Sequence, residues 1–70
     1  MITYKLLRSA ATNGRTSLNL YLYRDEELSR IATIATVEPT IAVRIFVEAQ
    51  MHLKRLGIPP APKTAMLQAA

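Results

Sequence analysis

The chain has 70 residues, a net charge of +4, one histidine and no cysteine. These values predict a single domain and exclude disulfide bridges and Cys/His metal sites. So short a chain buries only about 60% of its unfolded surface. Because half of its residues are hydrophobic, we expect oligomerisation, as a symmetric homodimer, to supply further stability.

The charge is distributed unevenly. Residues 1–23 contain Lys5, Arg8 and Arg15 and no acid, residues 24–49 contain three arginines and five acids, and the rest of the chain is again positive. Two basic ends around an acidic middle favour a polyanionic partner such as nucleic acid. Surplus lysines and arginines that only maintain solubility are the alternative.

No apolar run approaches the roughly 20 residues that span a bilayer. The N-terminus also lacks the charged start and apolar core of a secretory signal. We therefore expect a cytoplasmic protein without a membrane partner.

Residues 2–11 alternate in polarity and are typical of a short strand, although a helical turn would also be compatible with them. The following Asn13 and Gly14 tolerate positive φ and favour a type I′ hairpin turn. Such a turn would place Leu6 opposite Tyr21 on the next strand. The alternative is a flexible basic arm that ends in an ordinary loop.

Residues 16–23 form the clearest predicted strand, with strict two-residue alternation. One face carries Leu18, Leu20 and Leu22, and the other carries Ser17, Asn19, Tyr21 and Tyr23. This pattern predicts a sheet with one face on a core and the other towards solvent or a ligand.

The acidic cluster that follows is typical of a helix start. Asp25 can cap free backbone N–H groups, and Glu26 and Glu27 would lie at the positive end of the helix dipole. The next residues have helical apolar spacing, and Pro39 ends the run. We therefore expect a first helix between the acidic cluster and Pro39.

A second helix is predicted from about Pro39 to Leu56. Its main apolar stripe consists of Ala42, Ile45, Phe46, Ala49, Leu53 and Leu56. Further apolar residues lie outside that stripe, at Ile41, Val43, Val47 and Met51, so that only Arg44, Glu48, His52 and Arg55 form a polar strip. A helix with so narrow a polar face requires a partner surface. Gly57 would end it, which separates a domain at residues 1–57 from a proline-rich tail at residues 58–70.

Residues for catalysis are scarce. The carboxylates of the acidic cluster are explained by a helix start, and His52 is the only histidine and would lie on the polar strip. No phosphate-binding or dinucleotide motif is present. We therefore expect a protein that is not an enzyme and that needs neither a cofactor nor a metal.

The order of strand, acidic helix start, helix, break and helix resembles ribbon-helix-helix DNA-binding proteins of the Arc/MetJ kind. The similarity covers residues 17–56 and depends on E-E-L-S-R-I-A-T-I-A, on R-I-F-V-E-A at residues 44–49, and on the separation of fourteen residues between Ala35 and Ala49. The resemblance implies an α+β fold in which a small β-ribbon precedes two α-helices and the ribbon strands pair between the subunits of an intertwined homodimer. An intramolecular β-hairpin followed by two helices is the alternative fold.

Together these observations predict a sequence-specific DNA-binding regulator, either a repressor or an antitoxin-like protein, that reads double-stranded DNA through the major groove. The residues expected to contact DNA are Arg15, Ser17, Asn19, Tyr21, Tyr23 and Arg24, and the resemblance implies a further phosphate contact near Thr40. Those expected at a dimer or partner interface are Leu18, Leu20, Leu22, Ile41, Ile45, Phe46, Ala49 and Leu53. The alternative is a small interaction module, such as a phage-type inhibitor or an accessory subunit of a larger assembly, whose second helix covers a partner protein.

Overall fold

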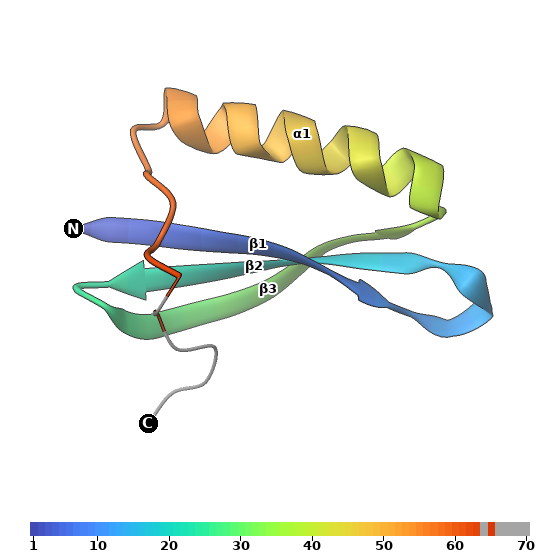
Figure 1. Ribbon diagram of the computed structural model, residues 1–70, viewed down its shortest axis with the longest axis horizontal. Helices are drawn as coiled ribbons and strands as arrows, with labels where there is room; N and C mark the ends of the chain where they lie inside the picture. Colours follow the sequence, from blue (N-terminus) through green and yellow to red (C-terminus); the bar gives the residue numbers. More distant parts are fainter. Residues whose placement is uncertain (64, 66–70) are drawn as a thin grey trace.

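The computed structural model describes residues 1–63 and 65, and within them the chain forms a three-stranded antiparallel sheet covered on one face by one helix (Figure 1). The strands lie in the order β1-β2-β3, so β2 is central. The elements are β1 (Ile2–Ala10), a 3-10 turn (Thr12–Gly14), β2 (Thr16–Arg24), β3 (Glu27–Val37) and α1 (Pro39–Arg55). The fold is therefore α+β.

The hairpin between β1 and β2 is present within the chain. Asn13 and Gly14 both have positive φ, at 58° and 69°, and the N–H of Arg15 donates to the carbonyl of Thr12 at 3.3 Å. These are the features of the predicted type I′ turn. However, the N–H of Ala11 donates to the carbonyl of Arg15, which leaves one extra residue in the loop.

The predicted strand register is consequently wrong by one residue. Leu6 lies opposite Leu20 instead of Tyr21, and Tyr4 lies opposite Leu22. This register places the inward residues of both strands on the same face of the sheet.

The predicted first helix is wrong, because that segment forms β3. Asp25 and Glu26 have φ values of 50° and 73° and make a two-residue turn, beyond which Arg24 pairs with Glu27. The acidic cluster is therefore a turn and not a helix cap. Of the eleven residues of β3, five are β-branched and favour a strand, namely Ile31, Thr33, Ile34, Thr36 and Val37.

Two bulges explain why β3 has helical spacing. Its register with β2 shifts twice, and Ser29 and Ile34 are left without a partner. The half-buried residues of the strand are Leu28, Ala32, Ala35 and Val37. Ala32 and Ala35 pair with leucines of β2 on the face that α1 covers, whereas Leu28 pairs with Tyr23 on the other face. The separations of four and three residues from Leu28 to Ala35 match those of a helical stripe, although these residues lie on two different faces of the strand. With one helix and three strands among its described residues, the chain does not match the two-helix arrangement of ribbon-helix-helix proteins.

The core lies between α1 and one face of the sheet. Tyr4, Leu6 and Leu53 form a buried cluster, against which pack Leu20, Leu22, Phe46, Ala49 and Ile58. Two residues of this core are fully buried, namely Leu18 on the covered face of the sheet and Ala42 on α1. The predicted apolar stripe of the helix is confirmed except at Leu56, which is exposed.

The chain beyond α1 crosses the end of the sheet next to β1 (Figure 1). Gly57 has a φ of 76° and ends the helix as predicted. The backbone N–H of Tyr4 then donates to the carbonyl of Pro59 at 3.1 Å, and the N–H of Ala61 donates to the carbonyl of Tyr4 at 2.7 Å. This short parallel pairing makes residues 59–61 a partial fourth strand beside β1.

Candidate interaction surface along the β1 edge

One side of α1 exposes a line of apolar side chains. Val43, Val47 and Met51 are 49%, 48% and 51% exposed. Because they recur every four residues, they lie above one another on one side of the helix. We refer to these three residues as the helix flank.

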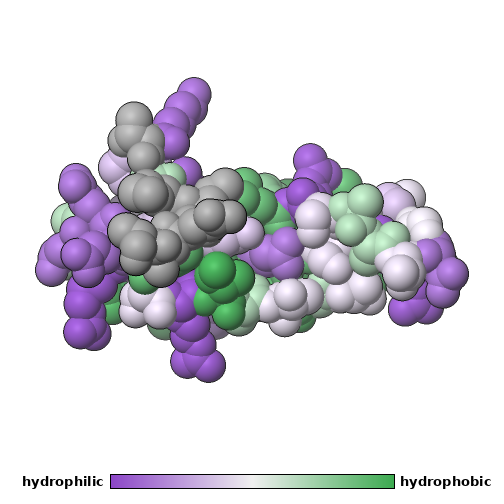
Figure 2. All heavy atoms as spheres, turned by 90° about the horizontal axis from the view of Figure 1, so that it is seen from below, coloured by the Kyte–Doolittle hydropathy of each residue, from purple (hydrophilic) through white to green (hydrophobic). Residues whose placement is uncertain are grey.

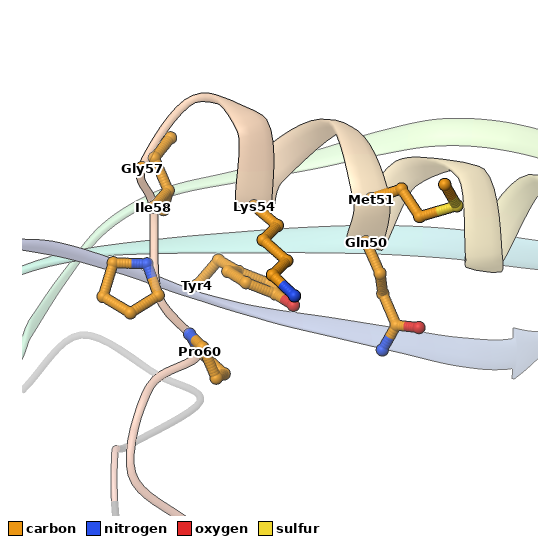
Figure 3. A pocket seen from close by; sticks show the side chains of 8 residues that line it. Tyr4, Gln50, Met51, Lys54, Gly57, Ile58 and Pro60 are labelled. Atoms are coloured by element: carbon orange, nitrogen blue, oxygen red, sulfur yellow. The ribbon is translucent and has the colours of Figure 1, made fainter.

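The helix flank lies on the β1 side of the molecule. Met51 lines an open hollow of about 540 Å³ together with Tyr4, and Ile58 and Pro60 line its far end. In Figure 3, Lys54 extends from α1 towards the ring of Tyr4. The hollow therefore separates the helix from the edge of the sheet, and the tail bounds it.

The outer edge of β1 is unpaired over residues 6–10 within the described part of the chain. Both backbone groups of Tyr4 bond outward to the tail, so Tyr4 and Leu22 form a pair without mutual hydrogen bonds. In an antiparallel pair this orientation recurs at every second residue. The N–H and C=O groups of Leu6, Arg8 and Ala10 therefore also point outward, and we refer to residues 6–10 as the open edge.

A second hollow, of about 370 Å³, connects the open edge with the tail. Leu6 and Leu7 line it from β1, Gln50 from α1, and Ala61 and Lys63 from the tail. Apolar side chains and backbone thus line it on several sides. The second hollow therefore joins the open edge of β1 to the space beneath α1.

The charged side chains along this side are basic. Lys5, Lys54 and Lys63 line the two hollows, and no described acidic side chain does so. The guanidinium of Arg8 lies 5.4 Å from the centroid of the Phe46 ring, within the range of a cation–π contact. The surface is therefore apolar at its centre and positive around it.

Hydrophilic and hydrophobic residues lie side by side on the visible part of the face opposite α1 (Figure 2). The side-chain amide of Asn19 donates to the hydroxyl of Ser9 at 3.0 Å, and the hydroxyl of Thr33 donates to the Asn19 carbonyl oxygen at 3.0 Å. The hydroxyls of Ser17 and Thr36 are hydrogen-bonded to each other at 3.1 Å. Ser17 and Asn19, two of the residues predicted to contact DNA, are thus hydrogen-bonded to side chains of neighbouring strands.

Tyr23 lies on this same face and is fully buried. Burial raises the pKa of its phenol, and the neighbouring Tyr21 raises it further. Among the described residues, its hydroxyl has no hydrogen-bond partner. Tyr23 is therefore not accessible to DNA in this conformation.

The structure brings together only part of the predicted DNA-contacting set. Ser17, Asn19 and Tyr21 are half-buried on the sheet face opposite α1, whereas Arg15 precedes β2 and Arg24 is its last residue. Thr40 lies apart from them, in the first turn of α1.

Most of the predicted interface residues serve the core of their own chain. Ile41 alone among them is exposed, and the others are buried or half-buried, namely Leu18, Leu20, Leu22, Ile45, Phe46, Ala49 and Leu53. The helix flank and the open edge were not predicted as sites. The flank has a signal in the sequence, since Val43, Val47 and Met51 are apolar residues outside the main stripe.

The described residues contain no cluster of three or more His, Cys, Asp or Glu side chains that could hold a metal ion. His52, the one histidine, is exposed on α1. In the part of the chain that the structure describes, no helix is long and apolar enough to cross a membrane.

Comparison of the chain with protein-family models, curated proteins and solved structures found no match. Its function is therefore inferred from the surfaces described above.

Proposed function

We propose that this protein is a non-enzymatic interaction module, such as an accessory subunit, that binds a partner protein through the β1 side of α1. The observation that carries this proposal is the helix flank, three apolar side chains in line that are each about half exposed. A contiguous apolar patch beside a hollow and rimmed by polar groups is typical of an interaction site.

The energetic argument depends on burial. Fully covering an exposed valine or methionine side chain contributes about 1.5–3 kcal/mol, and half-exposed side chains contribute part of that. Three such residues in one line can serve as adjacent anchors for a partner, as in helix-in-groove and strand-addition complexes.

Site-specific photocrosslinking in extracts of the source organism tests the proposal. A benzoylphenylalanine at Val47 should yield a discrete adduct, whereas the same group at Arg44, on the polar strip of α1, should not. Excess unlabelled protein should compete for the adduct, and excess Val47→Glu protein should not. Equal labelling from both positions, or none from Val47, would contradict the proposal.

DNA binding is the second candidate, and the sheet face opposite α1 favours it. Ser17, Asn19 and Tyr21 lie on one face, and the chain is basic overall. However, β2 pairs with β1 and β3 on its two sides, so it has no free edge for a ribbon shared between two subunits. DNA binding would therefore require that the face of the sheet, instead of a ribbon shared between two subunits, contact the duplex.

A DNA shift assay against random duplexes at low salt tests this second candidate. Binding through the sheet face should weaken on Tyr21→Ala and fall steeply as salt is raised. If a Val47→Glu substitution weakens the shift as much as Tyr21→Ala does, the sheet face is not the contact.

A further inference from the structure

We propose that the open edge accepts an extended acidic strand from a partner protein, which pairs with β1 beneath the helix flank. This inference rests on the proposed function and specifies the chemistry of the partner. It is carried by the backbone geometry of β1, the path of the tail and the distribution of charge.

The tail already shows that extended polypeptide fits beside β1. Residues 59–61 run parallel to β1 and bond to both backbone groups of Tyr4, at 3.1 Å and 2.7 Å. The same outward geometry continues at Leu6, Arg8 and Ala10. A second segment can therefore make the same kind of ladder further along the strand.

The described part of the tail leaves this edge before it reaches residue 6. The ammonium of Lys5 donates to the carbonyls of Lys63 and Ala65, at 3.3 Å and 2.7 Å. Lys5 lies on the sheet face away from α1, because its neighbours Tyr4 and Leu6 face the core. These contacts draw the described part of the tail towards that face, and among the described residues they leave residues 6–10 open over about 16 Å, the length of an ordinary strand.

The side chains of an added strand would alternate between two environments. Every second side chain would lie on the α1 side, where Val43 and Val47 are exposed. The others would lie on the opposite face, beside Leu7 and Ser9. Apolar residues alternating with polar ones therefore suit this site.

The charge favours an acidic strand. Arg8 and Arg15 line a further hollow of about 420 Å³ at the hairpin end, again without a described acidic side chain. The acidic turn at Asp25 and Glu26 lies at the other end of the sheet. Carboxylates on the incoming strand would therefore meet only basic partners among the described residues along the open edge.

A second copy of this chain fits less well. Two-fold antiparallel pairing of the open edge about its central residue would set Arg8 directly opposite Arg8 of the other copy. Like charges opposite each other on paired strands are destabilising. A nucleic acid has no alternating backbone donors and acceptors with which to continue the ladder, and it would leave the apolar flank uncovered.

The experiment uses the full chain and a fluorescein-labelled probe, the octapeptide (Glu-Val)4. Fluorescence anisotropy should show saturable binding, and amide NMR shifts should centre on Leu6, Arg8 and Ala10. The peptide (Lys-Val)4, and a (Glu-Val)4 peptide N-methylated at alternate residues, should bind at least tenfold more weakly.

Two variants test the site on the protein. Ala10→Pro removes an outward N–H without breaking a bond to β2, and edge strands tolerate proline, so it should weaken (Glu-Val)4 binding about tenfold. Arg8→Glu should do the same through charge, whereas Arg44→Glu, with the same charge change on the polar strip of α1, should leave affinity within about twofold. Thermal melting confirms that each variant is folded.

Three results would overturn the inference. Equal binding of the N-methylated peptide would exclude a backbone ladder, and equal losses from Arg8→Glu and Arg44→Glu would indicate unspecific attraction. A dimer in sedimentation whose open-edge amides are protected would make a second copy the occupant. If the Val47 crosslink persists while (Glu-Val)4 fails to bind, only this inference fails, whereas loss of both removes the proposed function as well.

Discussion

The backbone N–H of Ala61 donates to the carbonyl of Tyr4 at 2.7 Å, which joins the chain beyond the helix to the first strand of the sheet. The side chain of Tyr4 belongs to the buried core cluster, which Ile58 also contacts. The tail is therefore anchored through both backbone and side chains. Its described residues cover one end of the β1 edge and leave residues 6–10 open.

Replacing Ala61 with proline removes this donor, and the carbonyl of Tyr4 then loses its tail partner. We expect Ala61→Pro to lower the free energy of unfolding by about 1 kcal/mol and to accelerate hydrogen exchange at the amide of Tyr4. Urea denaturation and exchange measured by NMR provide the readouts. Ala61→Ser retains the N–H and should behave like the wild type, and indistinguishable variants would argue against the pairing.

Leu18 is fully buried on the helix-covered face of the sheet, whereas Val47 is about half exposed on the helix flank. Leu18→Ala should lower the free energy of unfolding by about 2–5 kcal/mol, a large share of the total for a domain of this size. Val47→Ala should change it by less than about 0.5 kcal/mol. Urea denaturation of both variants tests this difference, and a comparable loss from Val47→Ala would show that the flank is buried.

In the turn between β2 and β3, Glu26 has a φ of 73°, a backbone conformation that residues other than glycine rarely adopt. Glu26→Gly relieves this strain and should raise the free energy of unfolding by about 0.5–1 kcal/mol.

In the turn between β1 and β2, Gly14 allows the opposite substitution, from glycine to a residue with a Cβ. Its φ is 69°, and an added Cβ would meet no atom within 4 Å, so Gly14→Ala tests backbone strain alone. It should destabilise the protein by about 1 kcal/mol. Thermal melts of the two variants should shift in opposite directions, and shifts of the same sign would count against the turn conformations.

From the burial of the Tyr23 phenol we predict that the stability of the protein depends on pH in the alkaline range. Burial raises the pKa of its phenol above the ordinary value of 10.0, so the folded state prefers the protonated form. The corresponding contribution to stability is fully present below pH 10 and is lost as the pH rises through the raised pKa. Tyr23→Phe lacks this ionisation and should lose less stability than the wild type above pH 10.

At pH 7 the same substitution should be close to neutral, within about 1 kcal/mol, because the hydroxyl has no hydrogen-bond partner among the described residues. Chemical denaturation of wild type and Tyr23→Phe from pH 7 to beyond pH 10 measures both effects. Parallel pH curves for the two proteins would mean that the phenol ionises equally well in the folded and unfolded states.

Several elements follow from local sequence. Asn13 and Gly14 accept positive φ, which is a property of these two residues, and the turn forms where they occur. The strict alternation of β2 and the stripe of α1 from Ala42 to Leu53 likewise predict the faces that are buried. The helix flank was also visible, as apolar residues left over beside that stripe. In each case, residues within one or two turns or rungs of each other carry the pattern.

The tertiary structure decided the conformation of residues 27–37 and the place of each strand in the sheet. The segment at residues 27–37 carries the apolar spacing of a helix and the β-branched residues of a strand, and pairing with β2 through two bulges resolves the conflict. Once β3 occupies one side of β2 and β1 the other, β2 has no free edge, and β1 becomes the strand whose outer groups the tail covers in part. The basic residues around the open edge are visible in the sequence, since residues 1–23 contain no acid. The open edge itself has no local signal, because it depends on strand pairing and on tail contacts between residues more than 50 positions apart. The sequence by itself thus determined the turn at Asn13 and Gly14 and the apolar faces of β2 and α1, and long-range pairing determined the conformation of β3 and which strand lies at the edge of the sheet.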